Sequence, residues 1–366
     1  MDNRRIGLLD SFRFFAILGV MLYHYTFRWR SPGGGSTLYP YGAFFGNLFS
    51  RGYLGVMFFF MISGFVISYT LENTPTLSTF FKNRFVRLFP SMLLCSLITW
   101  LVAMKLDDKD LFINAHQAKN LLPGITFINP GIWSFMAHRN FAWISGSYWT
   151  IWTEVQFYVV VSVTYFLSRK YFFRNILLLT IAMSCIKYIP GFFLNIFPGD
   201  RLSPGWRSFF SEWKFIDERF NIIYFISWFM VGIFFHDLYK GRSVRLNSLN
   251  GIGMAIIFLY LLVTAGGYAS PIIYLLMVAA FLLMIYRKKY LSFLDNALFR
   301  RIGLLSYSVY LIHETIGILL INKYGAYLGD WSPLSPLIVI VLVILFAELS
   351  YRFYEKKLSL LLKRIL

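Results

Sequence analysis

The chain is organised in long apolar stretches separated by short polar and basic segments. An α-helix needs about 20 predominantly apolar residues to cross a bilayer, and most of these stretches approach that length. The pattern predicts an all-α polytopic membrane protein with about ten transmembrane helices. The ten predicted spans are residues 6–27, 52–71, 88–104, 147–167, 175–197, 220–238, 249–267, 271–286, 303–322 and 335–353.

Composition agrees with this pattern. The 366 residues are 58% hydrophobic and 14% charged, whereas soluble domains carry about 25% charged residues. The 40 Phe and 24 Tyr suit lipid-facing surfaces and interfacial belts. In the fifth span, Lys187, Pro190 and Gly191 predict a broken or bent helix, and the eighth span is short.

The basic residues indicate how the chain is oriented. Most Lys and Arg lie at one set of span ends, which the positive-inside rule assigns to the cytoplasm. We therefore expect both termini inside, membrane lipid as a partner, and no nucleic-acid binding despite the net charge of +18. The basic ends are the N-terminus, 72–87, 168–174, 239–248, 287–302 and the C-terminal tail.

Cysteines and the N-terminus add little chemistry. Cys95 and Cys185 fall in apolar segments, so we expect buried free thiols without a disulfide or a metal site. Asp10 and Arg13 interrupt the first apolar run, which argues against a cleavable signal peptide. We found no internal repeat, and we expect one transmembrane domain over residues 1–366 without a separate soluble domain.

The first span carries ionisable residues. Asp10, Arg13 and His24 each cost at least ~2.5 kcal/mol inside a membrane, so such residues usually face a protein interior. Arg13 and His24 are eleven residues apart, which places them on one helix face, about 16 Å apart along the axis. Alternatively, Asp10 and Arg13 neutralise each other near the membrane edge, and His24 is a satisfied histidine near the other interface.

Three other spans add candidate groups. Glu154 lies about 10 Å below the outer edge of the fourth span, where it could meet His24, or else pair with Lys187 or Arg13. In the ninth span, neighbouring residues point about 100° apart, so His313 and Glu314 are not expected to share a partner. The second span contains the small residues Gly55, Ser63 and Gly64, which predict a close contact with another helix. In the tenth span, Glu348 and Arg352 are four residues apart and are expected to form an ion pair.

Two surface features have two interpretations each. Arg84 and Arg87 lie one helical turn apart at the predicted cytoplasmic interface, where they anchor to anionic lipid or clamp a phosphate. The outer loop 198–219 mixes Trp206 and Trp213 with charged residues, an arrangement typical of sugar-binding loops and of loops on a membrane interface. The sequence has no P-loop, no GxGxxG, no GxSxG and no HExxH.

Five ordered motifs resemble the acyltransferase-3 family of integral-membrane acyltransferases. They are LDSFRFFAILGVMLYH, GYLGVMFFFMISGF, RFVRLFP, YWTIWTEVQFY and LSYSVYLIH, followed by the tail YRFYEKK. The resemblance implies a bacterial inner-membrane enzyme that moves an acetyl group from acetyl-CoA in the cytoplasm to a hydroxyl of an extracytoplasmic glycan. No metal is implied.

The resemblance also suggests roles for single residues. The family's arginine–histidine pattern falls on Arg13 and His24, its RxxR pair on Arg84 and Arg87, and its tryptophan–glutamate segment on Trp152 and Glu154. We expect His24 to act as general base with Glu154 and Arg13, and the arginines with Lys82 to bind the donor. We expect Ser63, Tyr148, Trp149, Trp152, Tyr307 and His313 to line the acyl path.

Two other classes of protein fit part of the pattern. Intramembrane Arg, Glu and His also occur in proton-coupled transporters, so a flippase of lipid-linked glycan is the alternative function. A membrane receptor or scaffold would bind no acyl donor. The missing repeats and the ordered motifs favour the enzyme over the transporter.

Overall fold

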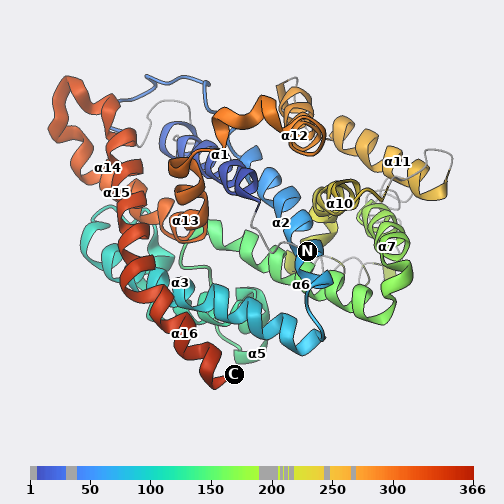
Figure 1. The fold of residues 1–366 in the computed structure, drawn as a ribbon. Coiled ribbons are helices and arrows are strands. Elements are labelled where there is room, and N and C mark those ends of the chain that lie inside the picture. The colour runs from blue at the N-terminus through green and yellow to red at the C-terminus, as the bar shows by residue number, and fades with distance from the viewer. Residues whose placement is uncertain are drawn as a thin grey trace.

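The computed structural model describes residues 6–29, 39–188, 218–242, 248–264 and 269–366, together with Gly205, Trp206, Phe209 and Trp213. Every regular element in these residues is a helix (Figure 1). The expectation of an all-helical protein is therefore confirmed for the described part of the chain.

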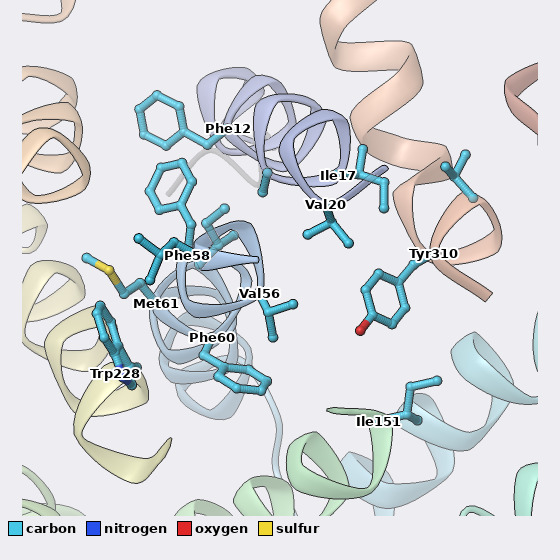
Figure 2. Close-up of a cluster of buried hydrophobic side chains, with 14 of the residues drawn as sticks. Phe12, Ile17, Val20, Val56, Phe58, Phe60, Met61, Ile151, Trp228 and Tyr310 are labelled. Carbon is cyan, nitrogen blue, oxygen red and sulfur yellow. The ribbon is translucent and has the colours of Figure 1, made fainter. Parts of the chain in front are cut away.

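Four helices form the centre of the bundle. Helix α1 (Gly7–Tyr23) continues into the π-helix η1 (His24–Arg28) and packs against α2 (Leu54–Glu72) and α13 (Ala297–His313). The opposite face of α2 packs along α10 (Ile222–Tyr239), which is the most extensive helix contact of the structure. Side chains such as Phe12, Phe58, Met61 and Trp228 fill the space between these helices (Figure 2).

The remaining helices surround this centre (Figure 1). On one side lie α14, α15 and α16, and on the opposite side lie α7 and α11. The surrounding helices are α3 (Leu77–Leu106), α4 (Leu121–Thr126), α5 (Pro130–Ala137), α6 (Trp149–Leu167), α7 (Phe172–Ile186), α11 (Leu249–Thr264), α12 (Ala269–Tyr286), α14 (Thr315–Tyr324), α15 (Ser335–Ser350) and α16 (Lys356–Ile365). The π-helix η8 (Tyr351–Glu355) joins α15 to α16.

Several helices can cross a membrane. In the described part of the chain, five helical segments are long and apolar enough, or six if the bent α12 segment is included. Each of the ten predicted spans coincides with at least one helix, although α6 and α13 do not reach that threshold individually. The chain is thus a multi-pass membrane protein, and its number of crossings stays a prediction.

Two local expectations differ from the structure, and a third cannot be compared with it. The ninth span is two helices, α13 and α14, because the helix breaks at Glu314. Cys185 is exposed on α7, whereas Cys95 is buried as expected, and both are free thiols. The predicted break in the fifth span at Pro190 and Gly191 lies outside the described residues; α7 ends at Ile186.

Glycines allow the central helices to approach closely. A Cβ atom on Gly64 would lie 2.0 Å from the carbonyl oxygen of Phe229, and one on Gly232 would lie 1.9 Å from that of Met61. The two positions face each other across the α2–α10 contact, and Gly55 touches α1 in the same way. The predicted role of small residues in the second span is therefore confirmed for these glycines.

Basic side chains tie the helix ends together at one end of the bundle, which we call the basic end. Arg242 forms an ion pair of 2.7 Å with Glu72 at the end of α2. Arg301 donates two hydrogen bonds to Glu348, which also pairs with Arg352 as the sequence predicted. The start of α1, the α2–α3 turn and α16 all lie at this end.

The glycine contacts predict that a methyl group added at Gly232 destabilises the fold, whereas one added at Gly19 does not. Gly232→Ala forces a methyl group against the α2 backbone and should destabilise the fold by roughly 1–3 kcal/mol. Gly19→Ala is the matched control, because its methyl group would find its nearest neighbour at 3.6 Å. We expect a melting temperature several degrees lower for Gly232→Ala in detergent and no change for Gly19→Ala; equal melting temperatures would contradict the close α2–α10 packing.

Candidate active site

Two connected cavities lead into the bundle from the basic end. The first, which we call the vestibule, has about 1310 Å³ of empty volume, and the second, the inner cavity, about 750 Å³, each including space open to solvent. The vestibule is lined by residues that include Ile6, Asp10, Arg87 and Glu355. Both cavities share Arg13, Val66, Arg87, Ser306 and Tyr307, so they adjoin, and we call the two together the path.

Arginine side chains line this path at different depths. The Arg13 guanidinium donates to Asp10 over 2.8 Å, which is the i, i+3 pair expected from the sequence. Arg84 is buried, donates to the Thr70 hydroxyl over 2.9 Å and packs over the rings of Phe80 and Tyr158. Neither Arg13 nor Arg84 is an exposed side chain.

Arg87 and Lys82 are placed differently from Arg84. Arg87 is exposed and lines both the vestibule and the inner cavity, so its guanidinium is available to a ligand. Lys82 donates to the Leu366 carbonyl over 2.6 Å and lines neither cavity. The two arginines of the RxxR pair are therefore brought to one path, and Lys82 is not.

Glu154 lies deep in the inner cavity. Its carboxylate accepts hydrogen bonds from the Ser63 hydroxyl over 2.7 Å and from the Tyr158 hydroxyl over 2.6 Å. The sequence suggested His24, Lys187 or Arg13 as its partner, and none of these is its hydrogen-bond partner in the structure. Lys187 instead lies over the rings of Tyr188, Tyr224 and Tyr260.

Tyr310 closes the far end of the inner cavity. Figure 2 shows its side chain extending from α13 into the space between α2 and α6, where Val56 and Ile151 also line the cavity. The Tyr310 hydroxyl accepts from the Thr150 hydroxyl over 2.9 Å and donates to the Ser147 carbonyl over 3.2 Å. Its ring is 5.1 Å from that of His313, so the histidine lies directly behind the cavity wall.

Behind Tyr310, two histidines and a glutamate form a buried group, which we call the histidine cluster. The His24 Nδ1 atom lies 3.6 Å from the Glu314 Oε1 atom, and the His24 and His313 rings are 5.0 Å apart. The His313 Nδ1–H donates to the Tyr310 carbonyl over 2.6 Å. Glu314 also accepts from the Ser145 hydroxyl over 3.4 Å. The carboxylate beside His24 is therefore Glu314.

Irregular backbone creates this cluster. Glu314 separates α13 from α14 and has ψ of −70°, so the 100° rule for neighbouring helical residues does not hold there. His313 and Glu314 consequently reach the same partner, which corrects the expectation that they would not. On the other side, η1 widens the helix at His24, and the Tyr25 hydroxyl donates to the His313 carbonyl over 2.9 Å. π-Helical turns often occur at functional sites.

Four predicted path residues line neither cavity; one of them, His313, belongs to the histidine cluster, and the other three pack elsewhere. Tyr148 is buried with its hydroxyl 3.4 Å from that of Ser96. The Trp149 ring packs against Phe225 at 5.1 Å, and Trp152 donates from Nε1 to the Arg219 carbonyl over 2.6 Å. These side chains fix α6 against its neighbours.

Tyr307 and Ser63, by contrast, do lie on the path. The Tyr307 hydroxyl is buried and has no hydrogen-bond partner among the described residues, although it borders both cavities. Sequence reasoning missed Tyr310 and Glu355, and it treated Glu314 only as a neighbour of His313. In the described residues no group of three or more His, Cys, Asp or Glu side chains is arranged to hold a metal ion.

Comparison with known proteins relates the whole domain to one enzyme family. Residues 6–352 match the family described as "Acyltransferase domain". The chain is 25% identical to the O-acetyltransferase OatA of Staphylococcus aureus strain NCTC 8325, over 95% of this chain and 56% of that protein. It is 24% identical to a putative O-acetyltransferase of strain COL, over 96% of this chain and 57% of that protein. The chain thus spans about half the length of these relatives, and no solved structure matches it.

The continuous path predicts selective chemical access. In a Cys185→Ala background, Ser306→Cys should react with a small sulfonate-bearing methanethiosulfonate, because Ser306 borders both cavities and the arginines attract the anion. Ser162→Cys is the matched control, since Ser162 is fully buried and lines neither cavity. Intact-protein mass spectrometry should show modification of the first variant only; equal modification of both would contradict the path.

Proposed function

The chain belongs to the acyltransferase-3 family and is an acyltransferase, and we propose that it moves an acetyl or similar short acyl group from acyl-CoA to a hydroxyl of an extracytoplasmic glycan. The observation that supports this most is the single path from the basic end to the wall of the histidine cluster. A donor entering at one end would bring its reactive group to a base that lies near the other.

The donor's shape and charge fit this path. The positive-inside rule places the basic end in the cytoplasm, where acyl-CoA occurs. Coenzyme A has a polyanionic nucleotide and a thin, uncharged pantetheine arm. Arg87 borders the vestibule, and Arg13 lies deeper on the same path. We propose that the arginines attract the nucleotide and that the arm extends toward Glu154 and Tyr310.

His24 is the proposed general base. Glu314 faces its Nδ1 atom, so a proton on Nδ1 leaves Nε2 as the proton acceptor. Nε2 removes the proton of the glycan hydroxyl, and the resulting oxygen attacks the thioester carbonyl carbon. The C–S bond then breaks, the acyl group stays on the glycan oxygen, and the proton on His24 passes to the leaving CoA thiolate. The Glu314 carboxylate stabilises the transient imidazolium.

Tyr310 has to move in this scheme. It separates the inner cavity from the histidine cluster, so the thioester meets His24 only when the Tyr310 ring swings aside. Among the described residues its hydroxyl bonds to Thr150 and Ser147, and exchanging two neutral hydrogen bonds is a small energetic cost. Tyr310 would thereby keep water and the donor apart until the acceptor is bound.

The acceptor is the least constrained part of the proposal. The relatives named O-acetyltransferases support a hydroxyl acceptor. His24 and Glu314 lie at the end of the bundle away from the basic end, which suits an acceptor arriving from outside the cell. We propose that the apolar helices contact membrane lipid and that the enzyme lies in the bacterial inner membrane.

One assay tests the enzyme against a transporter. Purified protein in detergent is given acetyl-CoA labelled in the acetyl group, with cell-envelope glycan as acceptor. Release of free CoA together with transfer of label to the glycan supports the proposal. If the donor is neither bound nor consumed, the proposal fails and transport of a lipid-linked glycan takes its place.

The histidine cluster predicts a split between binding and turnover. His24→Ala should abolish transfer, and Glu314→Gln should lower kcat by about 10²-fold or more, because general-base catalysis contributes about 10²–10⁴-fold. The KM for acetyl-CoA should stay within about twofold in Glu314→Gln, since Glu314 does not line the donor path. Wild-type turnover in His24→Ala would contradict the role of His24 as general base, and wild-type turnover in Glu314→Gln would contradict the role of Glu314 as its partner.

The arginine pair predicts a salt-dependent donor affinity. Arg84→Ala combined with Arg87→Ala should weaken acetyl-CoA binding, with a loss that shrinks as salt rises, because the exposed Arg87 is the proposed phosphate contact. Isothermal titration at two salt concentrations measures this. If the affinity for acetyl-CoA does not change, the two arginines do not bind the donor and have a lipid-anchoring or structural role.

A further inference from the structure

We propose that the groove between α3 and α16 binds the phosphate groups at the nucleotide end of the acyl-CoA donor, with Lys356 and Lys363 as the phosphate-binding residues. This inference rests on the proposed function and deepens it, because neither lysine belongs to the family motifs considered above. It names the place where the polyanionic part of the donor stays while the arm enters the bundle.

The groove lies at the basic end and opens to solvent. From α3 it is lined by Asn83, Val86 and Arg87, and from the other side by Tyr351, Glu355, Lys356, Ser359, Leu360 and Lys363. Lys356 and Lys363 are seven residues apart on α16, so they lie two turns apart on one face. The Ser359 hydroxyl donates to the Val86 carbonyl over 3.1 Å and fixes α16 against α3.

The groove continues into the donor path. Arg87, Tyr351 and Glu355 line both the groove and the vestibule. Arg87 also lines the inner cavity, so one side chain borders all three spaces. A ligand with its charged end in the groove can therefore extend through the vestibule without leaving the protein surface.

The charge of the groove favours phosphate. Arg87, Lys356 and Lys363 are exposed, and none of the three takes part in an ion pair among the described residues. The one acidic residue of the lining, Glu355, is buried. Three uncompensated cations around one opening attract an anion, and primary ammonium and guanidinium groups both bind phosphate oxygens.

Glu355 explains why the phosphates would stop in the groove. Its carboxylate accepts hydrogen bonds from Ser91 over 2.6 Å and from Ser308 over 2.8 Å, and Ser350 donates a third. A carboxylate offers about four acceptor positions, so one remains for a donor such as a pantetheine amide N–H. A hydrogen-bond acceptor at the junction suits an amide of the uncharged arm and offers no cation to a phosphate group.

The test pairs a charge change in the protein with a charge change in the ligand. The full-length protein is purified as wild type, Lys363→Glu, Lys356→Glu and Lys357→Glu, and the affinities for acetyl-CoA and for acetyl-dephospho-CoA, which lacks the 3′-phosphate, are measured by titration. Lys357 is the matched control because it is exposed on α16 but does not line the groove. Melting temperature and size-exclusion profile report whether each variant folds.

We expect Lys363→Glu or Lys356→Glu to weaken acetyl-CoA binding about tenfold or more, because an attraction becomes a repulsion, and to weaken acetyl-dephospho-CoA clearly less. Lys357→Glu should change neither affinity by more than about twofold. The milder Lys363→Gln should fall between wild type and Lys363→Glu, and it replaces the charge reversal if that variant does not fold.

The failures of the two proposals are distinguishable. If wild type binds acetyl-CoA but Lys356→Glu and Lys363→Glu bind it as wild type does, or no more weakly than Lys357→Glu, the groove is not the phosphate site and the proposed function stands. The groove assignment also fails, and the proposed function stands, if Lys356→Glu and Lys363→Glu weaken acetyl-CoA and acetyl-dephospho-CoA binding by the same factor. If wild type binds no acyl-CoA, the proposed function and the groove assignment fall together.

Discussion

Charged side chains inside an apolar helical bundle need partners, and this need organises the structure. An ionisable group in a membrane span is costly unless it faces protein or a water-filled cavity. Arg13 is paired with Asp10, and Arg84 lies against Thr70 and two aromatic rings. Because these groups face inward, they line a continuous cavity instead of contacting lipid.

Hydroxyl groups satisfy two carboxyl groups that line the path. Glu154 is held by Ser63 and Tyr158, and Glu355 by three serines. These hydroxyl groups satisfy acceptor positions of the two carboxyl groups that water would otherwise occupy. Arginines and hydrogen-bonded carboxyl groups thus line the same path, which suits a ligand with a charged head and a neutral, polar arm.

Regular helix packing and irregular helix backbone have different roles here. Gly64 and Gly232 bring α2 and α10 into direct backbone contact, which makes the centre of the bundle rigid. The π-helix at His24 and the break at Glu314 interrupt regular helices at the same depth, where the histidine cluster forms. The rigid centre thus carries an irregular, polar site whose side chains are set by neighbouring helices.

Much of the fold follows from sequence alone. Blocks of apolar residues specify helices, since a membrane-spanning segment has to satisfy its backbone hydrogen bonds internally. The motifs indicated the family and placed Arg13, Arg84, Arg87, Ser63 and Tyr307 on the path that the structure shows. Pairs within one helix, such as Asp10 with Arg13, were also predictable because helical spacing fixes their separation.

Contacts between helices were decided only by the tertiary structure. Sequence paired His24 with Glu154, because both lie in the outer half of their spans, but depth does not determine which faces meet. The break at Glu314 turns that carboxylate toward His24, and Glu154 finds Ser63 and Tyr158 instead. Exposure of Cys185 was missed for the same reason: an apolar segment has both a buried and a lipid-facing side. The sequence alone determined which residues are helical and which are charged, whereas the rotation, breaks and packing of the helices decided which of them meet, because those depend on neighbours that are distant in the chain.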